Sequence, residues 1–213
     1  MTKGSEVDLS RLTADYTAKD GETLTGTLAK NVKVSIADGA TVTLKDVTIN
    51  GENNDSYKWA GITCEGDATI ILTGTNTVKG FHENYPGIHV PTGKTLTIQG
   101  DGTLTASSNG SGAGIGGGNE IDCGNISITE GTINATGGTG AAAIGGGESA
   151  SCGNITIANT VTKVTAKAGG GANSIGAGSG TLATCGTVTI GGSVTGAIST
   201  SPYTYQPTPT RKR

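Results

Sequence analysis

The chain has 213 residues, enough for one domain with a substantial hydrophobic core. Its 14 basic and 17 acidic residues nearly balance, and no apolar run reaches the roughly 20 residues that span a membrane. We therefore expect neither nucleic-acid binding nor membrane insertion. Glycine is abundant at 38 residues while aromatic residues make up 3%, so the core must consist of Ile, Val, Leu and Ala.

Residues 1–30 precede the first repeated segment of the chain. The opening ten residues, MTKGSEVDLS, lack the apolar stretch of a signal peptide. Because such peptides are removed from mature proteins, this does not fix a location. We interpret residues 1–30 as an N-terminal extension that caps the repeats that follow.

Repeated strand patterns fill the middle of the chain. Three segments align without gaps, 28 and then 26 residues apart: IADGATVTL (36–44), CEGDATIIL (64–72) and VPTGKTLTI (90–98). Apolar residues alternate with Thr in each, the pattern of a half-buried strand. The same strand returns in residues 125–128, 154–157 and 187–190, at steps from Ile98 of 30, 29 and 33 residues. The sequence thus predicts six coils.

Each coil contains two further short segments. A second strand follows the first, most clearly in residues 102–106, 131–135 and 163–166. A shorter segment precedes it, centred on Ile62, Ile88, Ile115, Ile144 and Ile175. Three strands per coil of about 26 to 33 residues predict an all-β protein, a right-handed single-stranded parallel β-helix, over residues 31–196. Residues 197–213 are expected to form a C-terminal cap and an extended tail.

The alternation also predicts which side chains face the core. We expect inward ladders from the pairs Val42/Leu44, Ile70/Leu72, Leu96/Ile98, Ile126/Ile128, Ile155/Ile157 and Val188/Ile190. The residues between them should point outward: Thr43, Ile71, Thr97, Ser127, Thr156 and Thr189.

A glycine-rich stretch, SGAGIGGGNEIDCGN, has the G-x-G-x-x-G spacing of a dinucleotide-binding loop at Gly112, Gly114 and Gly117. That fingerprint requires a helix after the glycines, whereas the residues that follow alternate as strands. The stretch also returns in degraded form in residues 140–154 and 171–187. We interpret these glycines as scaffold, and we predict no cofactor.

The cysteines follow the repeat. Cys123, Cys152 and Cys185 each stand three residues before a core position, so they should stack on successive coils, while Cys64 belongs to the core of another face. None forms a C-x-x-C pair and no His lies nearby, which argues against a metal site. A ladder of buried thiols is the favoured interpretation, with a disulfide between neighbours as the alternative.

Two loops hold most of the chemically distinctive side chains. Residues 50–59 and 79–89 contain four of the seven aromatic residues and both histidines. Because the loops follow the last strands of adjacent coils, stacking should place them side by side. Aromatic rings beside polar groups suit a sugar, which stacks on the rings and forms hydrogen bonds through its hydroxyls. The candidate ligand-binding residues are Tyr57, Trp59, Phe81, His82, Glu83, Tyr85 and His89. The alternative is that these residues only cover the side of the solenoid.

Three functions remain open on the residues alone. The first is a non-enzymatic module that binds a glycan or a cell surface. The second is a polysaccharide lyase or glycoside hydrolase, with a catalytic pair drawn from Asp55, His82, Glu83 and His89, although no catalytic residue is assigned. The third is a structural spacer or an ice-binding-like surface, because Thr41/Thr43, Thr95/Thr97 and Thr187/Thr189 form outward threonine arrays.

The run NNDSYKWAGITCEGDATIILTGTNTVKGFHENYPGIHVPTGKTLTIQGDGTLTASSNGSGAGIGGG, followed by AIGGG and CGNITI, resembles carbohydrate-binding-domain-type β-helix modules. Such modules occur in secreted and surface proteins of gut bacteria such as the Bacteroidales. The resemblance covers residues 7 to about 206. It implies an extracellular or cell-surface location, a glycan or host-surface ligand, an adhesin-like role and, as an isolated domain, a monomer.

Overall fold

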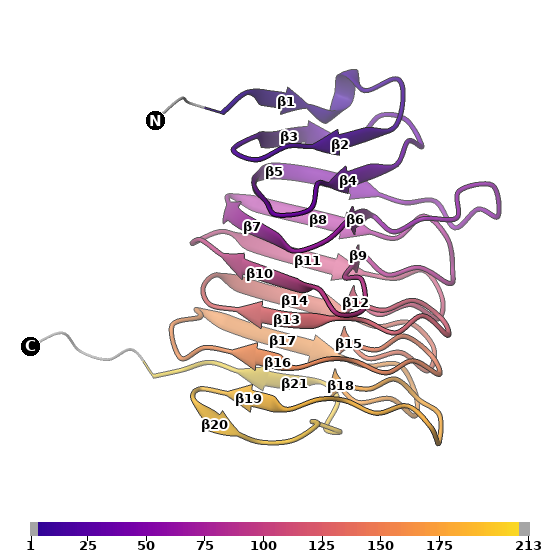
Figure 1. Cartoon of the computed structure of the whole chain (residues 1–213), viewed down its shortest axis with the longest axis vertical. Helices are drawn as coiled ribbons and strands as arrows, with labels where there is room; N and C mark the ends of the chain where they lie inside the picture. The colour runs from indigo at the N-terminus through magenta and orange to yellow at the C-terminus, as the bar shows by residue number, and fades with distance from the viewer. Residues whose placement is uncertain (1–3, 209–213) are drawn as a thin grey trace, which may run out of the picture.

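The computed structural model describes residues 4–208. The chain winds into a parallel β-solenoid of about five turns, with three short strands around each turn (Figure 1). The helical structure in the described part of the chain is a single 3-10 turn, η1 (Leu9–Arg11). The all-β parallel β-helix that the sequence predicts is confirmed. The basic run at residues 211–213 lies outside the described residues.

Two of the three faces belong to one sheet that bends along β5 (Ala40–Asn50). The first face extends from β5 in one direction through β7 (Ala68–Thr73), β10 (Thr95–Gln99), β13 (Asn125–Ile128), β16 (Ile155–Ile157) and β19 (Val188–Ile190). The second face extends through β8 (Thr75–Lys79), β11 (Thr103–Ser107), β14 (Thr132–Thr136) and β17 (Lys163–Lys167).

The third face is a separate sheet of shorter strands. It contains β2 (Tyr16–Ala18), β4 (Val34–Ile36), β6 (Ile62–Cys64), β9 (Ile88–His89), β12 (Ile115–Gly116), β15 (Ile144–Gly145) and β18 (Ile175–Gly176). The five isoleucines that the sequence places here stack in register and are all buried.

The corner between the first and second faces needs unusual backbone geometry. Asp46 lies inside β5 with a φ of 54°, and Gly74 turns the next coil with a φ of 66°. The Asp46 carboxylate also accepts a hydrogen bond from the Thr75 N–H at 2.9 Å. A short polar side chain tolerates left-handed backbone and satisfies the neighbouring turn, so β5 serves two faces without a break.

The core consists of inward ladders, and every predicted inward residue is buried. The register of the third coil differs from the ungapped alignment: Ile98 pairs with Ile70, and Leu96 pairs with Ala68. The first two steps are therefore both 28 residues, and the predicted step of 26 was wrong. A shift of two residues keeps each side chain on the same face of a strand, which is why the inward and outward assignment survived the error.

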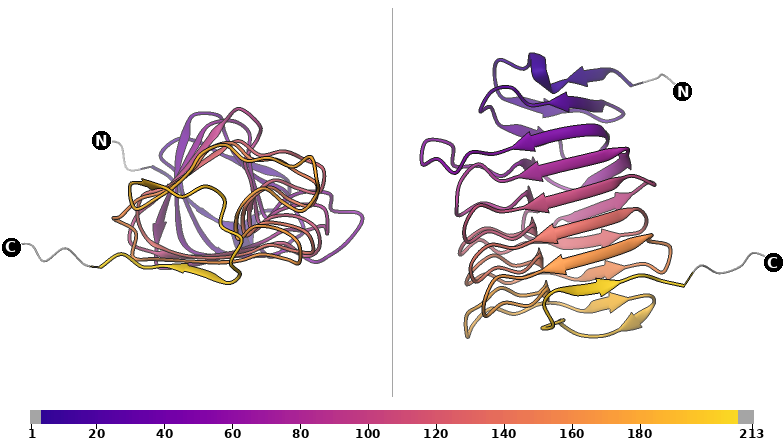
Figure 2. Two further views of the ribbon diagram at one scale, coloured as in Figure 1. Left: turned by 90° about the horizontal axis from the view of Figure 1, so that it is seen from below. Right: turned by 180° about the vertical axis from the view of Figure 1, so that it is seen from behind.

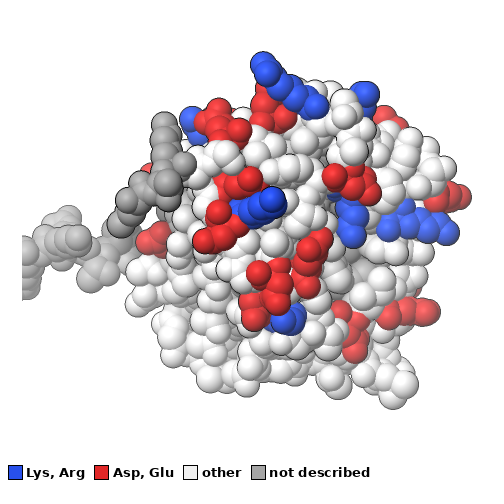
Figure 3. Space-filling model, turned by 45° about the horizontal axis from the view of Figure 1, so that its top comes forward, with Lys and Arg blue, Asp and Glu red and all other residues white. Residues whose placement is uncertain are grey.

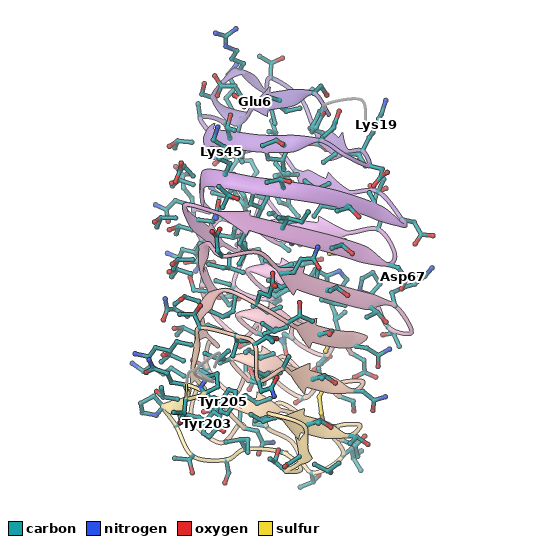
Figure 4. The ribbon with its side chains drawn as sticks, turned by 90° about the vertical axis from the view of Figure 1, so that its left-hand side faces the viewer. Glu6, Lys19, Lys45, Asp67, Tyr203 and Tyr205 are labelled. Atoms are coloured by element: carbon teal, nitrogen blue, oxygen red, sulfur yellow. A yellow bond between two sulfur atoms is a disulfide. The ribbon has the colours of Figure 1, made fainter. Side chains whose placement is uncertain are left out.

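The N-terminal residues form strands of the solenoid and also cover its end. Within the predicted cap, β3 (Thr23–Thr27) pairs in parallel with β5, and β1 (Glu6–Asp8) pairs in parallel with β3. Leu9 is fully buried at the end of the core. Figure 4 shows Glu6 near this end, with Lys45 of β5 below it. These residues thus continue the solenoid and close it with charged and short strands, which discourage edge pairing.

The C-terminal end is closed by antiparallel strands. Gly191 and Gly192 both have positive φ, and the chain reverses there so that β20 (Ser193–Val194) pairs antiparallel with β19. Then β21 (Tyr203–Tyr205) pairs antiparallel with β17, and its two tyrosines pack against the core (Figure 4). Because the chain reverses after β19, the sixth predicted coil is incomplete, and the solenoid has about five turns.

The glycine-rich stretch lies on the third face and is scaffold. Gly116, Gly145 and Gly176 stack on one another with φ values of 135°, 132° and 140°. A Cβ on Gly116 would overlap the carbonyl oxygen of Gly145, and one on Gly145 would overlap that of Gly176. Glycine is needed here for close approach between turns and for backbone torsions that other residues rarely adopt.

The cysteine ladder is partly oxidised. Cys152 and Cys185 form a disulfide with their Cα atoms 4.6 Å apart, whereas Cys123 and Cys64 are buried free thiols. The favoured prediction of a ladder of thiols was therefore wrong for two of its three members. Stacked parallel rungs bring the Cα atoms into the range that a disulfide spans, so the repeat itself permits the bond.

Candidate functional site

The loop between β5 and β6 is the largest departure from the regular outline of the solenoid. It stands out from the side of the stack, beyond the flatter corners of the later turns (Figures 1 and 2). Its tip, residues 52–56, is exposed, while Tyr57 and Trp59 near its end are half-buried. The loop therefore carries two aromatic rings at the base of a polar projection.

Three aromatic rings pack together where this loop meets the loop after β8. The ring centroids of Tyr57 and Trp59 are 5.3 Å apart, and those of Trp59 and Phe81 are 5.8 Å apart. Phe81 is only 2% exposed, so it supports the other two rings from below. The two loops do lie side by side, as predicted, but Phe81 belongs to the core and cannot contact a ligand.

His82 is also buried, at 5% exposure, and both of its ring nitrogens face protein groups. Nδ1 accepts a hydrogen bond from the Asn84 N–H at 3.1 Å, and Nε2 lies 3.4 Å from the Asp55 carboxylate. The Nδ1 contact places the ring proton on Nε2, from where it points at Asp55. His82 thus contacts both loops, and its burial argues against the ligand contact that the sequence predicts for it.

Glu83 and Tyr85 border the cluster. The Glu83 side chain is exposed, while its carbonyl accepts hydrogen bonds from the Ser111 and Gly112 N–H groups at 2.5 and 3.2 Å. Tyr85 is half-buried and packs its ring edge-on against His82, with centroids 5.9 Å apart. Both side chains remain available at the rim of the site.

His89 does not belong to this site. It lies on the third face, paired with Thr63 on one side and Gly116 on the other. Burial lowers the pKa of the His89 imidazole, and the positive charge of Lys33 lowers it further. The sequence grouped His89 with the loops because it follows residues 79–87, but the intervening turn carries it onto the next face.

The indole of Trp59 has an unsatisfied donor. In the described part of the chain, Trp59 Nε1 is the buried side-chain nitrogen for which no hydrogen-bond acceptor is found. A buried donor without a partner costs about 1–3 kcal/mol relative to one that is paired. The nitrogen itself is buried, so a ligand that lies on the exposed part of the rings does not reach it.

Asn109 stabilises the base of the site, and the sequence analysis missed it. Its side-chain N–H₂ group donates to the carbonyl oxygens of Gly51 and Gly80, at 3.1 and 2.6 Å. These two glycines begin the two aromatic loops, so one side chain from the next turn holds both. Nothing in the local sequence distinguishes Asn109 from the neighbouring turn residues, and only the stacking of turns reveals its role.

Surface hollows lie away from the aromatic loops. A shallow one of about 390 Å³ is lined by Glu120, Ser149 and residues 180–183. A second of about 220 Å³ lies at the corner between the first two faces and includes Asp101 and Glu130. Neither contains a predicted ligand-binding residue, so the aromatic site is a projecting surface and not one of these hollows.

Comparison with protein-family models, curated protein sequences and solved structures gave no match.

Among residues 4–208, no helix has the length and hydrophobicity needed to cross a membrane.

Proposed function

We propose that this solenoid is a non-enzymatic module that binds glycans through the projecting loop, with Tyr57 and Trp59 as the central contacts. The observation that carries the proposal is the pair of half-buried aromatic rings, with centroids 5.3 Å apart, at the base of an exposed polar loop. A sugar suits this surface, because its C–H face stacks on aromatic rings and its hydroxyls form hydrogen bonds with polar side chains. Glu83 and Tyr85 supply polar groups at the rim, while Phe81 and His82 hold the rings in place.

The same contacts favour binding over catalysis. A lyase or hydrolase needs acid and base groups that are free to reach the substrate. Here His82 is buried with both nitrogens facing protein groups, and one of those groups is the Asp55 carboxylate. His89 lies on another face. Neither histidine is thus free to act as an acid or base beside the exposed Asp55 and Glu83 carboxylates, which supports a binding role.

The proposed setting is the outside of a bacterial cell, as a secreted or surface-attached adhesin-like protein. The Cys152–Cys185 disulfide supports export, because disulfides persist in oxidising compartments and are rare in the cytosol. The likeness to β-helix modules of gut bacterial surface proteins supports the same setting. With its ends covered, the isolated domain is proposed to be a monomer.

Glycan-array binding by wild-type protein and the Trp59→Phe variant tests the proposal. Phenylalanine keeps an aromatic ring but presents a smaller face to the sugar, so affinity for the bound glycan should fall about 5- to 10-fold. Stability of the free protein should stay the same or rise by up to about 1 kcal/mol, since a buried unpaired donor is lost. Tyr205→Phe, at the far end of the solenoid, serves as the matched control and should bind as wild type. If no glycan binds, or Trp59→Phe binds equally well, the proposed site is wrong.

A second candidate function rests on the second face. The register places seven outward residues in one row, namely Thr27, Thr48, Thr77, Thr105, Asn134, Thr165 and Thr204. A shorter row of Thr75, Thr103 and Thr132 lies beside it. The first face carries one comparable row, namely Thr41, Thr69, Thr97, Ser127, Thr156 and Thr189, but in the row beside it Ile71 and Gln99 follow Thr43. Flat hydroxyl arrays of this kind favour an ordered-water or ice-binding surface.

Thermal hysteresis of the protein solution distinguishes this candidate. An ice-binding face should give a measurable gap between melting and freezing points that Thr105→Lys abolishes and that Thr156→Lys, on the first face, leaves intact. Absence of hysteresis in the wild-type protein would leave the rows as ordinary exposed strand residues, for which threonine has a high propensity.

A further inference from the structure

Three cysteines occupy the same position in successive turns, and only two of them are bonded. Cys152 and Cys185 form a parallel bridge and share the disulfide. Cys123, one turn earlier, is a free thiol. The central cysteine therefore has a sulfur neighbour in the turn on each side of it.

The backbone shows that the two steps of this ladder are equivalent. In each step the N–H of one cysteine donates to the carbonyl of the residue that precedes the next cysteine. The carbonyl of the first cysteine accepts from the N–H of the residue that follows the next cysteine. The two distances are 2.9 and 3.0 Å from Cys152 to the turn of Cys185, and 3.0 and 3.2 Å from Cys123 to the turn of Cys152. Cys123 thus stacks on Cys152 in the same register in which Cys152 stacks on Cys185.

We propose that Cys152 exchanges partners within the ladder and that Cys185 is thereby a site of modification by small-molecule disulfides. The Cys123 thiolate attacks Cys152 Sγ, a Cys123–Cys152 bond forms, and the electron pair of the broken bond stays on Cys185 Sγ as a thiolate. No net oxidation occurs in this step. The Cys185 thiolate then attacks a small disulfide RSSR, forms Cys185–S–S–R and releases one RS⁻.

The stacking direction suits this reaction. Thiol–disulfide exchange proceeds by displacement at sulfur, with the attacking and leaving sulfurs on opposite sides of the central one. The ladder places Cys123 and Cys185 on opposite sides of Cys152 along the solenoid axis. The backbone register therefore holds the attacking cysteine on the side of Cys152 from which the displacement must begin.

Exposure increases along the ladder in the direction of the exchange. Cys123 is 3% exposed and Cys152 is 8% exposed, whereas Cys185 is only partly buried. A reagent in solution is thus kept from the thiol that is free in the starting state. After exchange, the thiolate lies on the cysteine nearest the solvent, and the bulky adduct forms there instead of in the core.

Burial of Cys123 also controls the rate of the thiol–disulfide exchange. Burial, with help from the neighbouring Asp122 carboxylate, raises the pKa of the Cys123 thiol to about 12, while N–H groups such as that of Gly153 oppose the shift. The thiolate is the attacking species, so the exchange is slow near neutral pH and should accelerate about tenfold per pH unit below that pKa. The disulfide therefore stays with Cys185 under mild conditions and moves when the thiolate becomes populated.

Labelling with a chromogenic aromatic disulfide, followed by peptide mapping, tests the proposal. The folded protein is treated at about pH 9 for long enough that the small thiolate fraction, about 0.1% for a pKa of about 12, can react. A Cys64→Ala background makes Cys123 the single free thiol. We expect about one equivalent of released aromatic thiol, the label on Cys185, and a new Cys123–Cys152 bond. Label on Cys123 with the Cys152–Cys185 bond intact would overturn the proposal, as would no reaction of the folded protein when the unfolded protein reacts fully.

Two variants complete the experiment. Cys123→Ser removes the attacking sulfur and should leave Cys185 unlabelled under the same conditions; label on Cys185 in this variant would show direct attack by reagent and contradict the relay. Cys185→Ser, isolated under oxidising conditions, should contain a Cys123–Cys152 disulfide. Two free thiols in a folded Cys185→Ser protein would show that the first step of the ladder cannot close. If that variant does not fold, the label position in the wild-type ladder decides the question.

Discussion

The N-terminal and C-terminal halves of the solenoid share one architecture but differ in chemistry. Residues 4–107 contain 13 of the 17 acidic residues and 13 of the 38 glycines, whereas residues 108–208 contain 4 and 25. The described lysines and arginine follow the acids: Figure 3, which brings the N-terminal end forward, shows both signs interspersed there. The first half also carries the projecting aromatic loop. Charged and aromatic side chains are thus concentrated in the first half, and glycines in the second.

The coil spacing follows the same division. The steps between equivalent core residues are 28 and 28 residues in the first half, then 30, 29 and 33. The later turns accommodate their extra residues in glycine-rich corners, where backbone lies directly against backbone. Side-chain hydrogen bonds join the turns in both halves: the Asp46 carboxylate accepts from the Thr75 N–H, and the Asn125 side-chain oxygen accepts from the Asn154 N–H. The halves should therefore differ chiefly in their sensitivity to substitution of glycine.

The largest effect is expected from adding one methyl group to the glycine stack of the second half. Gly145→Ala should destabilise the protein by about 3–5 kcal/mol, because the new Cβ overlaps the Gly176 carbonyl and the backbone φ of 132° is unfavourable for alanine. Gly170→Ala is the matched control, since its Cβ would meet no atom within 4 Å. Urea unfolding of both variants measures the difference. Equal stability of the two would mean that the turns can separate, and that close packing does not define this half.

Reduction of the disulfide should have the next largest effect, and it should be confined to the C-terminal turns. The bond closes a loop of 33 residues, for which chain entropy gives about 3–4 kcal/mol. Hydrogen exchange with and without reductant should show loss of protection in β16, β18 and β19, while β5 to β8 stay protected. Uniform loss over both halves would show instead that the solenoid unfolds as a single unit.

In the first half, a buried asparagine should contribute more to stability than its position among apolar residues suggests. Asn76 is fully buried, accepts from the Val47 N–H at 3.0 Å and donates to the carbonyls of Thr73 and Thr103. Asn76→Leu matches the leucine, Leu104, that stacks beside it but leaves these groups unpaired, so we expect a loss of about 2–3 kcal/mol. Asn134→Thr, on the outer side of the second face, should change stability by less than about 0.5 kcal/mol. A stable Asn76→Leu protein would argue that side-chain hydrogen bonds between turns are dispensable.

Much of the fold was predictable because each strand is repeated. The alternation of Ile, Val and Leu with Thr gives the faces directly, and the conformational role of the Gly116 stack follows from its copies. Side-chain hydrogen bonds between one turn and the next were harder to predict. Asn76 stands in a position that the other turns fill with Leu, Ile and Val, and Asn109 looks like any turn residue. Apart from Thr73, which is three residues from Asn76, their partners lie 27 to 58 residues away in sequence, where no local pattern reaches.

The sequence predicted which residues gather at the candidate site, but not how deeply each one is buried. The sequence placed two aromatic loops side by side, which the ring contacts bear out. It could not show which rings point inward, because loop residues lack the strict alternation that sorts strand residues into two sides. Phe81 and His82 were therefore counted with Tyr57 and Trp59, although they lie beneath them. For the same reason His89, two residues into the next face, was grouped with a loop that it does not join.

The smallest effect expected is a pH dependence that belongs to the first half alone. On the third face His89 is aligned with Gly116 and, through it, with Gly145, so the later turns carry no titratable group in this row. Burial, with help from Lys33, lowers the pKa of His89, so the unfolded chain binds a proton more readily than the folded protein. Stability should therefore be greatest above the unfolded pKa of about 6.5 and fall as the pH drops below it, until the folded pKa is passed. Urea midpoints measured on both sides of this range should differ less in His89→Gln than in wild type. An unchanged pH dependence in the variant would move the acid sensitivity to the carboxylates, which are also concentrated in the N-terminal turns.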